Sequence, residues 1–226
     1  MPYRWLLFDA DDTLFDYQIA EEKSIKRAFN LLNLPFNQEI AGAYRVINHA
    51  YWAKFENGRI GLDELRIGRF SDLFKQFSIL ADPEAFSELY LTGLGLVADL
   101  NPGVLETLKE IDSTHEMAII TNGITQVQHS RMALSPIKSF FKHIFISEEI
   151  GISKPAAGFF DHVFKTIGNP SKQEVLVIGD SLTSDMAGGI NYGLDTCWYN
   201  PRGLENPKQL PITYQIQVIS QILEII

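Results

Sequence analysis

Cysteine is almost absent from this sequence: Cys197 is the one cysteine among 226 residues. A single cysteine excludes an intramolecular disulfide and fits a reducing compartment. No run approaches the ~20 consecutive apolar residues of a membrane-spanning helix. Acidic residues begin at Asp9, before any apolar stretch long enough for a secretory signal. We therefore expect a cytoplasmic protein that has no membrane as a partner.

Basic residues are also few, with 19 Lys and Arg against 28 Asp and Glu and a formal net charge of −9. This balance argues against a nucleic-acid polymer or an anionic membrane as a partner, because both repel an acidic surface. It does not exclude a small phosphorylated substrate, since a bound metal ion and a lysine can reverse the field locally. The length of 226 residues suits one large domain, or a core with a smaller domain.

The first part of the chain changes from a strand to helices. Residues 5–8 are four consecutive apolar residues, which predict a buried strand. From residue 17 to residue 95 the apolar residues recur at helical spacing, in four successive stripes. Asp82 followed by Pro83 predicts the start of the fourth helix, with an N-cap residue and a proline in the first turn. Four amphipathic helices in a row can pack as a small bundle.

After Leu100 short apolar strands alternate with helices. Strands are predicted at residues 117–120, 143–147, 175–178 and 196–199, and a closing helix is predicted at residues 219–226. This alternation is typical of βαβ units and of a parallel sheet covered on both faces. The expected fold is an α/β protein with a Rossmann-like parallel sheet. Its core comprises residues 1–16 and 96–226, and residues 17–95 form an inserted helical-bundle domain.

Three carboxylates follow the first strand directly, at Asp9, Asp11 and Asp12. Asp9 and Asp11 leave the chain on the same side if the extended geometry continues. Two carboxylates held so close repel each other unless one is protonated or a cation lies between them. Mg²⁺ suits such a site because it takes hard oxygen ligands from few protein carboxylates. By itself, the stretch fits an acidic turn after a core strand equally well.

Polar residues also follow two later strands, at Thr121-Asn122-Gly123 and at Asp180 with Asp185, and Lys154 lies in a loop before a helix. Each of these residues has a purely structural alternative. Thr121-Asn122-Gly123 could be a helix N-cap with a tight turn, Asp180 could lie in a turn, and Asp185 could be an acid in the first turn of a helix. Lys154 could be a solvated lysine in a loop. Structural roles alone explain the whole set of residues less well than they explain any single one. Ligands of open α/β sheets bind at the carboxyl ends of the strands, and all these residues are predicted at that edge.

These residues resemble the motifs of the haloacid dehalogenase (HAD) superfamily. The stretch Asp9-Ala10-Asp11-Asp12-Thr13-Leu14 is similar to its first motif, D-x-D-x-T-L. The remaining matches, in the family's order and spacing, are Thr121 for motif II, Lys154-Pro155 for motif III with Phe160 in its K-P-x-x-x-x-F run, and Gly179-Asp180 with Asp185 for motif IV. The inserted helices resemble the C1 cap of this superfamily, and the whole chain looks most like YjjG/YfnB-type pyrimidine 5′-nucleotidases. One departure is Asp12, which stands where glycine is commonest.

The resemblance implies a Mg²⁺-dependent phosphomonoesterase. Asp9 would be the nucleophile that forms an aspartyl phosphate, and Asp11 would protonate the leaving oxygen and later activate water. The ion would bind the side chains of Asp9 and Asp180 and the backbone carbonyl of Asp11. Four other residues are assigned supporting roles: Thr121, the amide of Asn122 and Lys154 at the phosphoryl oxygens, and Thr13 in the turn after Asp11. Asp185 would orient a metal-bound water or Lys154.

Several functions remain open at this point. The main hypothesis is a 5′-nucleotidase acting on pyrimidine nucleoside monophosphates; a phosphatase or phosphomutase acting on a sugar phosphate or another small phosphometabolite is the alternative. A haloacid dehalogenase needs the aspartate nucleophile but no metal, so Asp11, Asp180 and Asp185 argue against it. A non-catalytic binding protein would not need all of these acids. The aromatic residues Tyr44, Tyr51, Trp52 and Phe55 could stack on a nucleotide base, although aromatics at helical spacing more often pack in a core.

Overall fold

Residues 3–226 are described by the computed structural model, and the chain divides into two units. Unit 1 comprises Met1–Tyr17 and Ala98–Ile226, and unit 2 comprises Gln18–Val97. Met1 and Pro2, with which the predicted core segment 1–16 begins, lie outside the described residues. Each unit has its own core, and the two are described in turn.

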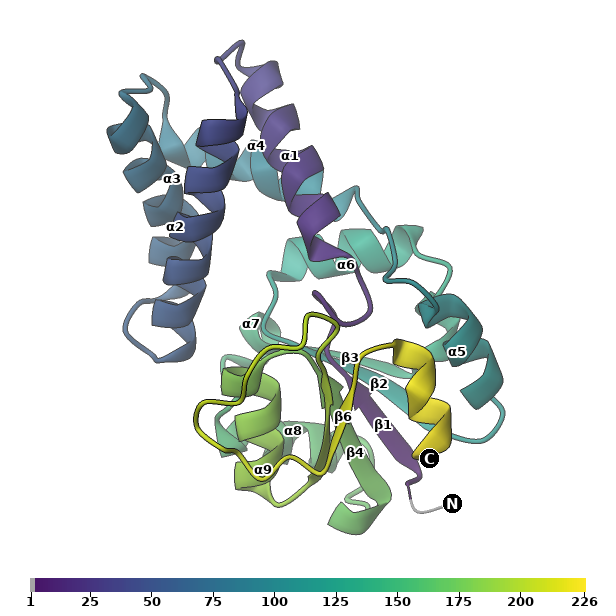
Figure 1. Cartoon of the computed structure of the whole chain (residues 1–226). Helices are drawn as coiled ribbons and strands as arrows, with labels where there is room; N and C mark the ends of the chain where they lie inside the picture. Colours follow the sequence, from purple (N-terminus) through teal and green to yellow (C-terminus); the bar gives the residue numbers. More distant parts are fainter. Residues whose placement is uncertain (1–2) are drawn as a thin grey trace. The chain divides into compact units, whose positions relative to one another are not determined.

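Six strands of the described residues form one sheet in unit 1, in the order β3-β2-β1-β4-β5-β6 (Figure 1). All neighbouring strands run parallel. The strands are β1 (Trp5–Phe8), β2 (Glu116–Thr121), β3 (His143–Ile146), β4 (Val175–Gly179), β5 (Asp195–Tyr199) and β6 (Tyr214–Ile216). The predicted α/β fold with a parallel sheet is therefore confirmed.

Helices cover both faces of this sheet, as Figure 1 shows for α5 and η4 on one side and α8 and α9 on the other. The helical segments of unit 1 are α5 (Val104–Ile111), α6 (Thr125–Leu134), η1 (Lys138–Phe140), α7 (Ser147–Ile150), α8 (Ala157–Thr166), η2 (Lys172–Glu174), η3 (Leu182–Met186), α9 (Ala187–Tyr192) and η4 (Ile219–Glu224). Because side chains alternate along a strand, Leu6 and Phe8 pack in one apolar cluster and Trp5 and Leu7 in the other. This double covering explains why all four residues of β1 are apolar.

The structure differs from the sequence-based expectation at three places in unit 1. The sequence predicts that strands alternate with helices, but the helical segment after β4 begins with a π-helical turn, η3, before α9. Strand β6 was not predicted, since it has only three residues and no apolar run. The predicted closing helix is present as a 3₁₀ helix, and it ends at Glu224 instead of residue 226. Its Ile219 and Ile222 are nonetheless buried against the sheet.

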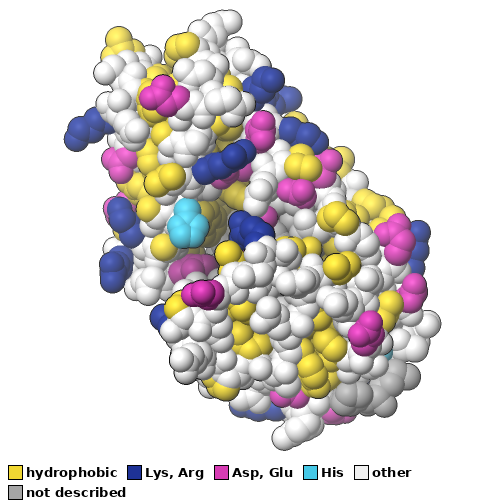
Figure 2. Space-filling view, in the orientation of Figure 1, with side chains coloured by type: hydrophobic (Ala, Val, Ile, Leu, Met, Phe, Trp, Pro, Cys, Tyr) yellow, Lys and Arg dark blue, Asp and Glu magenta, His cyan; other side chains and the backbone are white. Residues whose placement is uncertain are grey.

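Unit 2 is helical, as predicted. Its helices are α1 (Tyr17–Leu31), α2 (Gln38–Glu56), α3 (Leu62–Phe77) and α4 (Pro83–Gly95). The side chain of Asp82 accepts a hydrogen bond from the backbone nitrogen of Glu84 at 3.0 Å, with Pro83 in the first turn, so the predicted N-cap is confirmed. No helix within residues 3–226 is long and apolar enough to cross a membrane. Acidic and basic side chains are interspersed over the face that Figure 2 shows.

Aromatic side chains form the centre of unit 2. Phe70 is fully buried, stacks on Tyr44 with ring centroids 5.3 Å apart, and lies 5.0 Å from Phe86 and 5.2 Å from Tyr90. Two of the four aromatic residues considered for base stacking are therefore buried inside unit 2. Tyr44 packs in this cluster, and Tyr51 is buried and donates from its hydroxyl to Asp72 at 2.8 Å. The other two, Trp52 and Phe55, are partly exposed and contact each other.

Replacing Phe70 with alanine tests this packing. Because Phe70 contacts three rings and has no exposed surface, we expect Phe70→Ala to lower the free energy of unfolding by about 3–5 kcal/mol. Leu80 is 97% exposed, so Leu80→Ala is the control and should change the same quantity by less than about 0.5 kcal/mol. Urea unfolding followed by circular dichroism measures both. Equal effects of the two substitutions would contradict this description of the core.

Candidate active site

Three neighbouring strands bring polar residues to one edge of the sheet. Strands β2, β1 and β4 are adjacent and parallel, and Asp9, Thr121 and Asp180 lie at or just beyond their carboxyl ends. The chain continues from β1 to β2 on one side, and β4 pairs with β1 on the other, so the strand order reverses there. Such a switch point is where open α/β sheets bind ligands. The ladder reaches Asp9, whose backbone nitrogen donates to the carbonyl of Ile178 at 2.8 Å.

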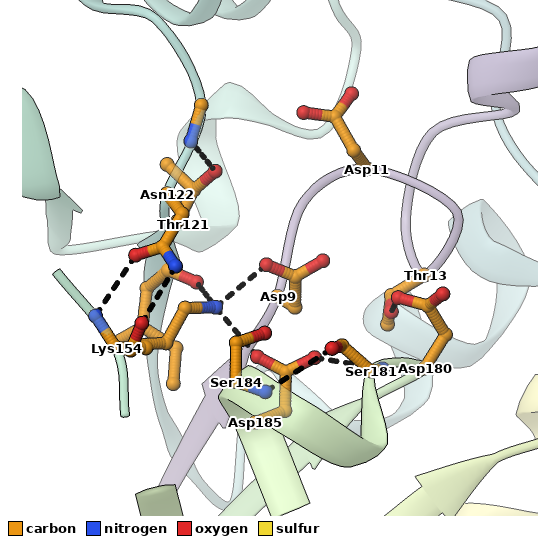
Figure 3. A network of polar contacts seen from close by, with 12 residues as sticks. Asp9, Asp11, Thr13, Thr121, Asn122, Lys154, Asp180, Ser181, Ser184 and Asp185 are labelled. Atoms are coloured by element: carbon orange, nitrogen blue, oxygen red, sulfur yellow. Dashed lines mark hydrogen bonds and ion pairs between the residues drawn. The ribbon is translucent and has the colours of Figure 1, made fainter. Parts of the chain in front are cut away.

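The ammonium group of Lys154 lies among the carboxylates at this edge (Figure 3). Its Nζ atom donates to Asp9 Oδ1 at 2.7 Å, to Asp185 Oδ1 at 2.6 Å and to the carbonyl of Ile120 at 2.6 Å. An ammonium group has three donors, and each has an acceptor here. The side chain is 1% exposed, so Lys154 is not a solvated loop lysine.

Asn122 holds the backbone of Lys154 in place. Its side-chain nitrogen donates to the carbonyl of Lys154, and its side-chain oxygen accepts from the backbone nitrogen of Lys154, both at 2.9 Å. The hydroxyl of Thr121 accepts from the backbone nitrogen of Gly123 at 2.9 Å. The structure thus brings Thr121, Asn122 and Lys154 together, and the Asn122 side chain supports the lysine.

Asp185 approaches the sheet closely because residue 179 is glycine. A Cβ atom at Gly179 would lie 2.2 Å from Asp185 Oδ2, which no side chain can accommodate. Asp185 belongs to the π-helical turn η3, and its Oδ2 accepts from the backbone nitrogen of Ser181 at 3.1 Å. One oxygen of Asp185 therefore holds the turn and the other holds Lys154. Asp185 thus contacts Lys154 directly, and its role in orienting Lys154 or a metal-bound water stays a prediction.

Asp9, Asp180 and Asp185 form the acidic cluster of the site, and each can offer an oxygen within 4.8 Å of the others. Burial raises the pKa of Asp9 and of Asp180 well above the usual carboxyl range, although Lys154 opposes this at Asp9. Burial by itself would lower the pKa of Lys154, but Asp185 and Asp9 outweigh it and raise that pKa. One ammonium group cannot neutralise three carboxylates. This set of hard oxygen ligands therefore fits a divalent cation.

Asp11 lies outside the acidic cluster, and Figure 3 shows its carboxylate pointing away from Asp9. Its Oδ2 accepts from Gln128 Nε2 at 2.7 Å, and its Oδ1 accepts from Arg131 Nη1. Sequence reasoning missed Gln128 and Arg131. They lie one turn apart on α6, and nothing in the sequence distinguishes them from surface residues of that helix.

The turn after Asp11 is held mainly by the backbone. The nitrogens of Leu14 and Phe15 both donate to the carbonyl of Ala10, at 3.0 Å and 2.9 Å. The hydroxyl of Thr13, expected to fix this turn, lies 3.4 Å from Asp180 Oδ1 and so links the turn to the acidic cluster. Asp12 has φ of 57°, the left-handed region that glycine favours and aspartate tolerates. This backbone angle accounts for the position at which the sequence departs from the family's commonest residue.

The fold and the site define an α/β enzyme with a cluster of carboxylates at the switch point of the sheet. Residues 3–193 match the model of the haloacid dehalogenase-like hydrolases, and the chain belongs to this family. The predicted membership is therefore confirmed.

Three relatives are similar over nearly the whole chain. The HAD-hydrolase YfnB of Bacillus subtilis is 36% identical, over 99% of this chain and 95% of its own length. The magnesium-bound crystal structure of YfnB superposes with a TM-score of 0.95 and covers 100% of this chain and 99% of the YfnB chain. The pyrimidine 5′-nucleotidase YjjG of Escherichia coli is 30% identical, over 100% of this chain and 99% of its own length. The pyrimidine 5′-nucleotidase PynA of Streptococcus pneumoniae is 35% identical, with 99% and 95% covered.

The acidic cluster predicts that a divalent cation stabilises the folded protein. At a Mg²⁺ concentration 100-fold above its Kd, we expect Tm to rise by roughly 5–10 °C, because only the folded chain assembles the ligands. Asp180→Asn should remove most of this shift. Asp112→Asn, an exposed residue at the end of α5, is the matched control and should keep the shift. Differential scanning fluorimetry in chelator and in Mg²⁺ measures it. Equal shifts in Asp180→Asn and the native protein would contradict the site.

Proposed function

We propose that this chain is a Mg²⁺-dependent phosphomonoesterase that acts through an aspartyl phosphate on Asp9, with pyrimidine nucleoside 5′-monophosphates as substrates. The observation that carries the proposal is the buried Lys154 between Asp9 and Asp185, with Asp180 completing an acidic cluster at the switch point. A carboxylate nucleophile beside a fixed cation is suited to attack on an anionic phosphate ester.

The reaction has two displacements at phosphorus. Lys154 holds Oδ1 of Asp9 and thereby orients the carboxylate, whose other oxygen attacks phosphorus. A bond forms between that oxygen and phosphorus, the bond to the leaving oxygen breaks, and Asp11 gives its proton to the leaving oxygen. Asp11 then takes a proton from water, whose oxygen attacks phosphorus and releases inorganic phosphate and Asp9.

Asp9 and Asp180 would hold the Mg²⁺ through their side chains, with the backbone carbonyl of Asp11 as a further ligand and Asp185 beside Lys154. The ion would supply positive charge that lets an anionic ester approach carboxylates. Thr121, the backbone amide of Asn122 and Lys154 would bind the phosphoryl oxygens. A magnesium-bound relative of the same fold supports this assignment.

The alternatives are less well supported. A dehalogenase uses an aspartate nucleophile without a metal ion, and it would have no need of Asp180 and Asp185 beside it. The nucleotide substrate is supported by two relatives, YjjG and PynA, which are pyrimidine 5′-nucleotidases. We further propose that residues 17–95 act as the cap domain. The single Cys197 suits a cytoplasmic location, and the net charge of −9 disfavours polynucleotides as partners.

The first test concerns the nucleophile and the metal ion. The native protein should hydrolyse an aryl phosphate in Mg²⁺, lose this activity in excess chelator, and be inhibited by Ca²⁺, whose looser coordination misplaces the nucleophile. Asp9→Asn should lower kcat by on the order of 10⁴-fold and abolish the phosphoenzyme. Asp112→Asn is again the control. Phosphate incorporation into Asp9→Asn at the native level would show that another residue is the nucleophile, and full turnover without metal would revive the dehalogenase.

The second test concerns the substrate class. We expect UMP, dUMP and dTMP to have higher kcat/KM than glucose phosphates or phosphoglycolate, with purine nucleotides disfavoured by size. Stacking of a base on an aromatic side chain is worth about 1–3 kcal/mol, or roughly a 10- to 100-fold preference. A side-by-side kinetic panel measures this. The highest kcat/KM on a sugar phosphate would refute the nucleotidase and leave the phosphatase mechanism intact.

A further inference from the structure

Asp11 is held by α6 through both of its carboxylate oxygens. Gln128 Nε2 donates to Oδ2 at 2.7 Å, and Arg131 Nη1 donates to Oδ1. The side chain of Asp11 is 28% exposed, whereas that of Arg131 has no exposed surface. Two donors on different oxygens fix the rotation of the planar carboxylate as well as its position, which one hydrogen bond would not do.

The burial of Arg131 is not explained by packing, since an apolar side chain could fill the same volume. Its guanidinium group is buried and lies 4.9 Å from the centroid of the Phe15 ring. Among residues 3–226, its Nε and Nη2 atoms have no hydrogen-bond partner, so part of a buried cation is left unsatisfied. Such burial is costly, and an apolar side chain of similar volume is often as stabilising or more so. The contact with Asp11 is therefore the feature that distinguishes Arg131 from an apolar residue.

The loop after β2 is shaped around Gln128. Gln128 is buried, and a Cβ atom at Gly123 would lie 2.2 Å from Gln128 Nε2 and 3.0 Å from Thr121 Oγ1. Only a residue without a side chain leaves room at 123 for the Gln128 amide to reach Asp11. Thr121 ends β2 and Asn122 begins this loop, so two of the predicted phosphate-binding residues directly precede the glycine that makes room for Gln128.

Asp9 and Asp11 therefore have different surroundings although they are two residues apart. Lys154 holds Asp9 in the acidic cluster, and α6 draws the carboxylate of Asp11 away from it. Pairs of acids in unlike environments commonly have separate roles. From these contacts, we propose that Gln128 and Arg131 are positioning residues that aim the Asp11 carboxylate for proton transfer to the leaving group.

The direction of Asp11 suits this role, which rests on the proposed phosphatase function. In phosphoryl transfer the attacking and leaving oxygens lie roughly in line on opposite sides of phosphorus. A proton for the leaving oxygen must therefore arrive on the side remote from Asp9, and the Asp11 carboxylate points away from Asp9 (Figure 3). Without its two donors, the partly exposed side chain would sample other rotamers, and proton transfer would slow while substrate binding would change little.

Gln128→Met and Arg131→Met test the proposal, because each keeps a long side chain but removes the donor. The measurement is the rate of leaving-group release in a single turnover, with UMP as a poor leaving group and p-nitrophenyl phosphate as a good one. We expect the rate with UMP to fall about 10- to 100-fold, because an alkoxide must be protonated as it leaves. With p-nitrophenyl phosphate the fall should be under about threefold, because p-nitrophenolate leaves without a proton. KM should change less than about twofold.

Gln126→Met is the matched control: it makes the same exchange on the same helix, but Gln126 is exposed, and its rates should equal those of the native protein. Arg131→Lys should recover part of the rate lost in Arg131→Met, since an ammonium group can also donate to Asp11. Thermal unfolding of each variant shows whether it is folded. If Arg131→Met does not fold, Gln128→Met and Arg131→Lys carry the test.

A double-mutant cycle with Asp11→Asn separates positioning from a structural role. If Gln128 and Arg131 act through Asp11, their substitution in the Asp11→Asn protein should change the p-nitrophenyl phosphate and UMP rates by less than about twofold. Equal losses with and without Asp11, or equal losses for both leaving groups, would overturn the proposal. An active native enzyme with variants that match it refutes this inference alone. A native protein that hydrolyses neither ester in Mg²⁺ refutes the proposed function, and this inference with it.

Discussion

One buried ammonium group sets the arrangement of the carboxyl edge of the sheet. Lys154 Nζ joins three groups: Asp9 just after β1, Asp185 in η3, and the carbonyl of Ile120 in β2. A charge so deeply buried is tolerated only where its partners surround it, so the loops must converge on it. Two features serve this convergence on Lys154. The Asn122 side chain makes two hydrogen bonds to the backbone of Lys154, and the absence of a side chain at Gly179 leaves room for Asp185. Because three carboxylates of the acidic cluster face one ammonium group, negative charge remains in excess, and a divalent cation would offset it.

The two acids of the first motif show how the end of a β-strand can place two nearby side chains in different surroundings. Asp9 still belongs to the ladder, because its backbone nitrogen donates to the carbonyl of Ile178, and Lys154 holds its side chain. Asp11 lies beyond the ladder, in a turn, and receives its order from another element, α6. A carboxylate held by a buried lysine and a carboxylate held by a helix are thus obtained from residues two positions apart. The strand fixes the backbone of Asp9, and the turn lets the side chain of Asp11 face a different direction.

Much of the fold and of the site could be predicted from the sequence, because strands buried on both faces are continuous apolar runs. The polar residues after such runs, Asp9, Thr121 and Asp180, had to meet at one edge once the sheet was parallel. Gln128 and Arg131 could not be found this way, since a helical Gln and Arg resemble solvated residues until the packing of α6 is known. Tyr44 was ambiguous for the same reason: helical spacing shows that residues share a face, but not what that face contacts. Strand β6 was too short to leave a pattern.

The insertion of unit 2 into unit 1 has a consequence for the newly made chain. Strand β1 is synthesised first, yet its neighbours begin at Glu116 and Val175, and all of Gln18–Val97 is made in between. Domains emerging from the ribosome fold as units, so the helical unit can complete its aromatic core while Trp5–Phe8 still has no strand to pair with. The earliest apolar segment of the protein is thus among the last to be covered. For that interval the side chains of Trp5–Phe8, which are buried in the folded protein, have no sheet to cover them.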